Sequence, residues 1–212
     1  MYIPALYREK DPQKILTFLQ HHSFGIMIST GTDLMPVATH VPFIFEERSG
    51  TLIAYTHISR ANTQSTYLPE GQKVLLIFQG AHTYISSSWY DHPNVPTWDY
   101  EVVHLYGTIH KLDERDTVLH LESLMHFHEQ HETSPLSFHD LDPDFIQKEK
   151  KGLIAYSVTI DEIQAARKLS QNRDNVNLER IIQALRLRND EMSEQIADEL
   201  ALLLKQRNEA HE

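Results

Sequence analysis

The chain has 212 residues, of which 41% are hydrophobic and 23% are charged. This length and composition suit one globular domain with an appendage, or at most two small domains, and they exclude a disordered or peptide-like protein. The formal net charge of −11 is opposite in sign to the basic surfaces that bind nucleic acid backbones, so direct and strong DNA or RNA binding is disfavoured.

The sequence contains no cysteine, which excludes disulfides, thiolate metal sites and cysteine nucleophiles. No stretch approaches the ~18 consecutive apolar residues that a membrane-spanning helix needs. Residues 1–11 also lack the apolar region of a signal peptide. We therefore expect a cytoplasmic protein whose chemistry comes from other side chains or from a bound cofactor.

The N-terminal half predicts one helix followed by strands. A helix is expected from Asp11-Pro12 to about residues 22–23, because Pro suits the first helical position and Ile15 and Leu19 then share an apolar face. Strands are expected at residues 24–29, 37–45, 52–55, 73–79, 83–86 and 100–110, with turns such as 31–33 between them. Closely spaced strands separated by turn residues predict a barrel.

The C-terminal half is mostly helical in pattern. Helices are expected at residues 113–131 and around 145–150, then a strand at 153–160, then helices at 178–187 and 192–204 on either side of a break at Asn189-Asp190. Residues 170–188 also fit half of a helix-turn-helix. Residues 174–212 hold nine acidic and five basic residues, which favours a helical pair packed on the core over a DNA-reading element.

The segment 56–62 carries the most informative polar group. Ser59, Arg60 and Asn62 follow directly after a predicted strand. A hydroxyl, a guanidinium and an amide at the end of a strand can bind a phosphate dianion, because Arg binds it bidentately and Ser donates a hydrogen bond. The alternative is an ordinary cap by Ser59 with a solvated Arg60.

Two further segments suit a planar ligand. Pro36 and Pro42 bracket a strand whose unpaired backbone groups could meet a hydrogen-bonding ring, although prolines also protect an edge strand from aggregation. Residues 78–100 contain both tryptophans and three tyrosines, together with His82 and His92. Such an aromatic loop suits an amphipathic ring, and it equally suits a rigid packed loop at a dimer interface.

Residues 120–131 form a histidine-rich helix with His120, His126, His128 and His131. His128 and His131 share a helix face and could ligate a metal or haem iron. A solvated face is the simpler interpretation of this run, and we assign no metal site to it.

Taken in order, a series of segments resembles the signature segments of the PaiB-type FMN-binding negative transcriptional regulators, from the first residue to about Leu185. The segments are residues 1–4, 38–43, 57–62, 78–86, 89–90, 95–98, 103–107 and 168–173. The resemblance implies an α+β, mainly β fold: an FMN-binding split β-barrel, similar to the pyridoxamine-phosphate oxidase group, with peripheral helices and a C-terminal helical pair. It further implies residues 1–165 as the barrel domain, residues 166–212 as a helical extension packed on it, and FMN at a homodimer interface.

The resemblance also implies the residues that contact FMN, and it assigns none to catalysis. Ser59 and Arg60 correspond to the residues that grip the phosphate. The other expected contacts are Thr39, His40, Val41 and Pro42 at the flavin ring, His57 and Asn62 in support, and Trp98 and Tyr100 from the partner subunit. Asp99 stands where the family usually has Asn, which would add a negative charge near an anionic cofactor.

Three functions remain open at this point. The first is a regulatory protein in which FMN occupancy or redox state alters a partner, with direct DNA binding disfavoured by the acidic charge. The second is an FMN-dependent oxidoreductase in which the protein positions the flavin. The third is haem binding or degradation with His40, His82 or His128 as the axial ligand.

Overall fold

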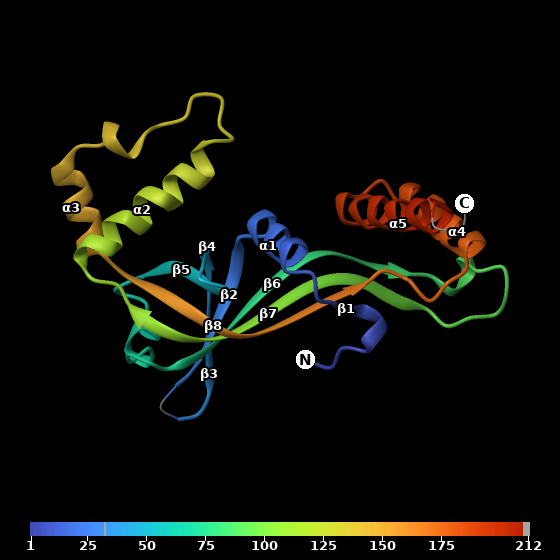
Figure 1. The fold of residues 1–212 in the computed structure, drawn as a ribbon, viewed down its shortest axis with the longest axis horizontal. Coiled ribbons are helices and arrows are strands. Elements are labelled where there is room, and N and C mark those ends of the chain that lie inside the picture. Colours follow the sequence, from blue (N-terminus) through green and yellow to red (C-terminus); the bar gives the residue numbers. More distant parts are fainter. Residues whose placement is uncertain (32, 210–212) are drawn as a thin grey trace. The chain divides into compact units, whose positions relative to one another are not determined.

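The computed structural model describes residues 1–31 and 33–209, so Thr32 of the predicted turn and the last three residues of the acidic tail lie outside the described residues. The strands are β1 (Arg8–Glu9), β2 (Phe24–Thr30), β3 (Pro36–Pro42), β4 (Ile44–Arg48), β5 (Thr51–Ser59), β6 (Lys73–Ile85), β7 (Thr97–Lys111) and β8 (Leu153–Lys168). The helices are α1 (Pro12–His21), α2 (Glu114–Glu129), α3 (Pro143–Lys151), α4 (Asn175–Arg186) and α5 (Glu191–Glu209), with 3-10 turns η1 (Ala5–Tyr7), η2 (Thr63–Tyr67), η3 (Ser87–Trp89) and η4 (Phe138–Asp140) (Figure 1).

The strands form one sheet in the order β3-β2-β6-β7-β8-β5-β4, and β1 also pairs with β8. A single residue, the fully buried Phe43, joins β3 to β4, which are the two ends of this order. The Thr56 hydroxyl on β5 donates to the Pro42 carbonyl at the end of β3 over 2.7 Å. The sheet therefore curls on itself, and the predicted mainly β barrel class is confirmed.

Most predicted elements are present, with four main differences in extent. The strand predicted at 52–55 is the longer β5, so His57 and Ser59 lie within this strand and not after it as was predicted. The predicted strand 37–45 is two strands, because the chain bends at Phe43. The two short strands predicted at 73–79 and 83–86 are the continuous β6. The strand predicted at 153–160 continues to Lys168, past exposed residues 161–163 where alternation of buried and exposed positions is lost.

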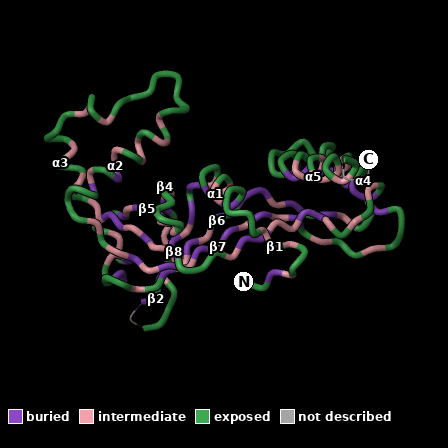
Figure 2. Tube along the Cα trace, in the orientation of Figure 1, coloured by how far each residue is buried: buried purple, intermediate pink, exposed green. Residues whose placement is uncertain are grey.

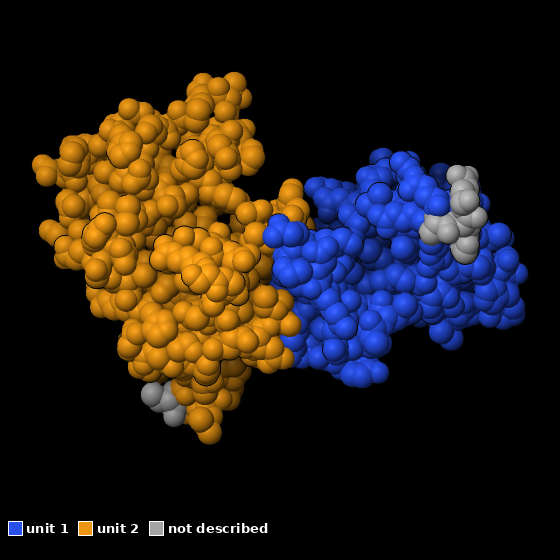
Figure 3. Space-filling model, in the orientation of Figure 1, with its two compact units in different colours: residues 1–15, 79–103, 164–212 blue, residues 16–78, 104–163 orange. Residues whose placement is uncertain are grey.

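The chain folds into two compact units, which are coloured separately in Figure 3. Unit 1 comprises residues 1–15, 79–103 and 164–212, and unit 2 comprises residues 16–78 and 104–163. The strands β6, β7 and β8 contribute residues to both units. The division expected from the resemblance, at residues 165 and 166, stays a prediction.

Unit 2 contains the core of the curled sheet. Buried and partly buried residues alternate along its strands, as Figure 2 shows for the tube through β7. Phe43 and Phe78 pack edge to face with ring centroids 5.1 Å apart. At Gly107, a Cβ would lie 2.5 Å from the Thr159 carbonyl oxygen, so only glycine permits β7 and β8 to approach this closely.

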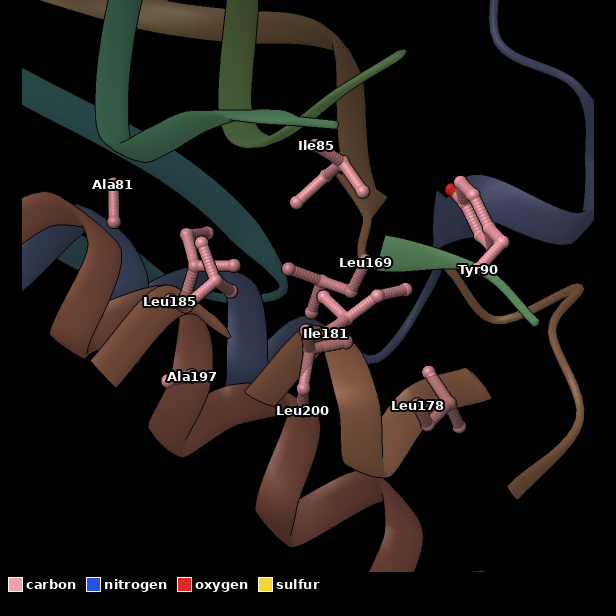
Figure 4. Packing of buried hydrophobic residues seen from close by; sticks show 10 residues of the cluster. Ala81, Ile85, Tyr90, Leu169, Leu178, Ile181, Leu185, Ala197 and Leu200 are labelled. Atoms are coloured by element: carbon pink, nitrogen blue, oxygen red, sulfur yellow. The ribbon is translucent and has the colours of Figure 1, made fainter. Parts of the chain in front are cut away.

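Unit 1 contains the helical pair and its own core, drawn in Figure 4. Leu178, Ile181 and Leu185 of α4 are fully buried, and they pack with residues of α5 and with Ile85 of β6. Asp174 caps α4 by accepting a hydrogen bond from the Asn177 backbone over 2.9 Å. The predicted C-terminal helical pair is confirmed. None of the helices in the described ranges is long and apolar enough to cross a membrane.

Candidate functional site

The exit of β5 lies against β3 in unit 2. The Asn62 amide donates to the Thr39 hydroxyl over 3.0 Å, and the Asn62 side-chain oxygen accepts from the Gln64 backbone over 2.9 Å. Asn62 thus caps η2 and also connects it to β3 by a hydrogen bond. Thr39 and Asn62, two of the residues expected at FMN, are directly bonded to each other.

Gln64 holds the same region together from inside. Its side chain is fully buried, and its Nε2 lies 3.1 Å from Met27 O, 3.0 Å from Ser29 Oγ and 3.1 Å from Val37 O. One glutamine in a polar run carries no periodic signal, so Gln64 was not among the predicted site residues. The structure shows that it positions β3 relative to the β5 exit.

Arg60 is exposed and is held by backbone oxygens at the α3–β8 junction. Its Nε donates to Lys151 O and its Nη2 donates to Leu153 O, both over 3.1 Å. These bonds use two of the five guanidinium N–H groups, and they fix the orientation of the plane. No hydrogen bond within the described ranges uses Nη1.

Basic residues surround the place where Arg60 is anchored. Lys148, Lys150 and Lys151 form the last turn of α3, where positive charge also complements the helix dipole. Lys150 is paired with Glu114 over 3.4 Å, and Lys148 and Lys151 are exposed. The three lysines at 148–151 are visible in the sequence, but they were not among the predicted binding residues. With Lys150 paired, Arg60, Lys148 and Lys151 outnumber Glu149, so this short stretch carries an excess of positive charge in a chain whose net charge is −11.

Ser59 and His57 point to the same face of β5, because alternate residues of a strand share a face. Ser59 is exposed, and its hydroxyl oxygen accepts from the Ala61 backbone over 3.2 Å, which leaves the hydroxyl hydrogen available to an anion. His57 Nδ1 lies 3.1 Å from Nε2 of His120 on α2. Burial lowers the pKa of both rings, that of His120 to about 3, so this pair is neutral at pH 7.

The expected contacts on β3 lie on both faces of that strand. Val41 is 5% exposed and belongs to the core, so only its backbone could meet a ligand. His40 is exposed on the opposite face, where its ring stacks on Phe24 at 6.2 Å. Pro42 is partly buried and accepts the Thr56 hydrogen bond.

Trp98 and Tyr100 belong to unit 1, so they lie in a different unit from the eight other expected contacts. Trp98 is 54% exposed, and its ring lies 6.1 Å from both His82 and Tyr84. The aromatic segment expected to form one loop is thus divided. Trp89 and Tyr90 pack against the helical core, and Trp98 and Tyr84 form an exposed patch.

Asp99 does not carry a free charge into this patch. Its side chain is fully buried, its Oδ2 accepts from the Ser170 hydroxyl over 2.7 Å, and Lys168 Nζ lies 3.6 Å from Oδ1. Burial raises the pKa of the carboxyl above its usual value, although Ser170 and Lys168 oppose this. Asp99, which stands where the family usually has Asn, is therefore part of the interior of unit 1.

The basic side chains of the helical pair are used within unit 1. Each of the five makes a contact: Arg180 with Trp89 O (2.7 Å), Arg186 with Asp198 (3.2 Å), Arg188 with Thr83 (2.8 Å), Lys205 with Glu209 (3.9 Å) and Arg207 with Arg173 O (2.7 Å). Such an arrangement differs from the free cationic stripe that phosphate backbones need. The helix-turn-helix alternative therefore has no support here.

The histidine run at 120–131 divides in the same way. Because α2 ends at Glu129, His131 lies beyond the helix and does not share a helix face with His128 as was predicted. His120 is 3% exposed and pairs with His57, and His128 and His131 are exposed. Among the described residues, no group of three or more His, Asp and Glu side chains has the arrangement of a metal site.

Comparison with known proteins identifies the family. Residues 1–162 match the model of a family described as "Putative FMN-binding domain". "Protease synthase and sporulation protein PAI 2" of Bacillus subtilis is 34% identical over 198 residues, which cover 93% of this chain and 95% of that protein. The chain belongs to the PaiB-type FMN-binding family. Its cofactor is FMN, as the resemblance of its ordered segments implied.

Solved structures confirm that this chain has the split-barrel fold. The FAD- and haem-binding protein of Mycobacterium smegmatis matches with a TM-score of 0.58 at 17% identity, over 76% of this chain and 73% of that one. A flavocytochrome of Azotobacter vinelandii matches with a TM-score of 0.58 at 18% identity, over 76% of this chain and 69% of that one. At these identities the likeness concerns the fold alone.

The donor set at the β5 exit fits the phosphate of FMN. Ser59 offers an O–H, Arg60 offers the N–H groups of Nη1 in a fixed plane, and Lys151 adds positive charge from the adjoining turn. These are the groups that bind a dianion at a protein surface. A flavin bound there would supply hydride or electron chemistry, while the protein residues bind and orient it.

Proposed function

We propose that the exit of β5 binds the FMN phosphate through Ser59 and Arg60, with the flavin ring directed towards β3. The observation that carries this proposal is the double anchoring of Arg60 on Lys151 O and Leu153 O, because a pre-oriented guanidinium loses little freedom when it binds an anion. The Asn62–Thr39 bond supports it by holding β3 beside the proposed phosphate position. His57 supports Ser59 from the same strand face.

The proposal includes a homodimer in which the partner subunit's Trp98 and Tyr100 cover the flavin. The exposure of Trp98 and its contacts with Tyr84 and His82 support this role, since an exposed aromatic cluster is suited to a planar ring or to an interface. A monomer in solution that still binds FMN with full affinity would contradict it.

In the cell we propose a regulatory role, in which FMN occupancy or redox state alters a partner in the cytoplasm. The name of the Bacillus subtilis relative, which concerns protease synthesis and sporulation, supports regulation. The charge of −11 and the internal use of the basic side chains of α4 and α5 argue for action through a protein partner. NAD(P)H-dependent turnover of an added electron acceptor would instead favour the oxidoreductase.

The test compares FMN with riboflavin, which has the same ring and no phosphate. Flavin absorbance and fluorescence titrations should give the unsubstituted protein a strong preference for FMN. In Ser59→Ala and Arg60→Ala this preference should fall, about tenfold for Arg60→Ala because a charge-assisted contact is lost. Riboflavin affinity should stay within about twofold of the unsubstituted protein, because the ring contacts remain.

Arg48→Ala is the matched control. Arg48 is an exposed arginine of the same unit at the end of β4, paired with Glu46 over 2.7 Å, and the proposal gives it no contact with FMN. An equal loss of preference in Arg48→Ala and Arg60→Ala would show a general charge effect and overturn the assignment. An unchanged preference in Arg60→Ala would remove Arg60 from the phosphate site.

A further inference from the structure

Unit 2 contains a cavity of about 720 Å³ between α2 and the strands β4 and β5. Figure 1 shows α2 beside these two strands. The volume of the cavity lies within the range of small-molecule sites, roughly 300–1,000 Å³. None of the ten residues expected at FMN lines it: the lining residues that matter here are Phe45, Tyr55, Asp116, Leu119, His120 and Glu122. It is therefore separate in composition from the proposed phosphate site.

The cavity lining combines apolar side chains with more acidic than basic side chains. Ile44, Phe45, Leu119 and Phe127 supply the apolar part. The charged lining residues are Glu46, Arg48, Asp116 and Glu122, and the one base among them is already paired with Glu46 over 2.7 Å. Asp116 and Glu122 thus bring two further carboxylates to the lining, although Asp116 also interacts electrostatically with Arg48 and Glu122 contacts His139 at 3.1 Å.

A second, independent observation comes from His120. This side chain lines the cavity, it is only 3% exposed, and its Nδ1 has no hydrogen-bond partner among the described residues. An unpaired buried polar atom carries a free-energy cost that a ligand would relieve. Because Nε2 of His120 already pairs with His57, Nδ1 is the ring atom left as an acceptor in the neutral ring. Nδ1 has almost no exposed surface, so an ammonium N–H would reach it only by displacing neighbouring side chains.

We propose that this cavity binds an organic cation with an aromatic or alkyl body. The ammonium group lies towards Asp116 and Glu122, and the body packs on Phe45, Leu119 and Phe127. An adjoining cavity of about 410 Å³ shares Glu122, His126 and Gln130 with the first, so a ligand longer than one ring also fits.

The cavity is linked to the proposed FMN phosphate site along one face of β5. Tyr55 lines the cavity, His57 contacts His120, and Ser59 follows, at alternate positions of the strand. Tyr55 and Ser59 are about 13 Å apart at ~3.3 Å per residue. A cation that orders α2 on this face also orders His57 and Ser59, so we infer that it tightens FMN binding. This second part rests on the proposed function.

Calorimetry on the flavin-free protein tests the cavity alone. The probes are 2-phenylethylamine and 3-phenylpropionate, which have similar bodies and opposite charges. We expect the amine to bind at least about tenfold more tightly than the acid, and Asp116→Asn to weaken the amine about threefold, the size of a partly exposed charge contact. Leu119→Trp, which fills the cavity from an exposed position, should abolish binding.

Glu114→Gln is the matched control. It removes one carboxylate from the same first turn of α2 and does not line the cavity. Equal binding of the two probes, or equal weakening by Asp116→Asn and Glu114→Gln, would overturn the cation site. These measurements need no FMN, so they stand whether or not the proposed function holds.

FMN titrations with and without saturating 2-phenylethylamine then test the linkage. We expect FMN to bind about fivefold more tightly in the presence of the amine, at the lower end of measured coupling between sites. His120→Phe keeps a ring of similar size and removes the contact with His57, so it should abolish the fivefold increase in FMN affinity. An unchanged FMN affinity in the presence of bound amine would overturn the linkage, whereas failure of FMN to bind at all would overturn the proposed function instead.

Discussion

Two polar clusters of this chain use similar side chains in opposite surroundings. At the β5 exit, Ser59 and Arg60 are exposed and keep donors free for a ligand. At the start of β7, Asp99 and Ser170 are almost completely buried and bonded to each other over 2.7 Å. A hydroxyl beside a charged group is thus the proposed phosphate site in one unit and a structural contact in the other. Burial, more than residue type, separates the two roles.

This contrast predicts that changes in unit 1 reduce stability without altering flavin selectivity. The largest effect is expected for Ile181→Ala, because Ile181 is fully buried in the helical core and its truncation leaves a cavity. The free energy of unfolding should fall by about 3 kcal/mol, measured by urea denaturation. The preference for FMN over riboflavin should be retained. Loss of that preference in folded Ile181→Ala protein would break the contrast.

A buried residue within the β5-exit region should behave like those of unit 1. Gln64→Leu keeps a side chain of similar size and removes the donor to Met27 O and Val37 O. We expect the free energy of unfolding to fall by about 2 kcal/mol, since buried carbonyls lose their partner. Thr66→Val, an exposed change in the same 3-10 turn, is the control and should cost much less. Equal effects of the two substitutions would contradict the role given to Gln64.

The smallest effect concerns Asp99 and depends on pH. Burial raises the pKa of Asp99 in the folded state, so between its unfolded and folded pKa values the folded protein binds more protons. This group therefore makes the protein less stable as pH rises through that interval. Asp99→Asn, which restores the residue usual in the family, should remove this contribution and stabilise the protein by about 1 kcal/mol at pH 7.

The measurement is the free energy of unfolding of both proteins at pH 4 and pH 7. The gain from Asp99→Asn should be larger at pH 7 than at pH 4. A loss of stability at pH 7 would show that the contact with Lys168 outweighs the cost of burial, and would reverse our interpretation of this cluster.

The sequence predicted the elements better than the contacts of the candidate site. The helix at α1 and the helical pair followed from capping residues and apolar spacing, and the structure confirms them. The anchoring of Arg60 on Lys151 O was not predictable, because these residues are 91 positions apart. The same holds for Gln64, whose three partners lie 27 to 37 residues earlier in the chain.

The sequence by itself determined the family, the mainly β class and the residue types that suit a phosphate. Ordered motifs and local periodicity depend on residues that are close together in the sequence. Only the tertiary structure decided which of these side chains are free. Asp99 is buried and His57 is paired with His120. Three arginines of the helical pair, Arg180, Arg188 and Arg207, donate to groups elsewhere in unit 1. Whether a polar group meets solvent or another side chain depends on long-range packing, which no local pattern contains.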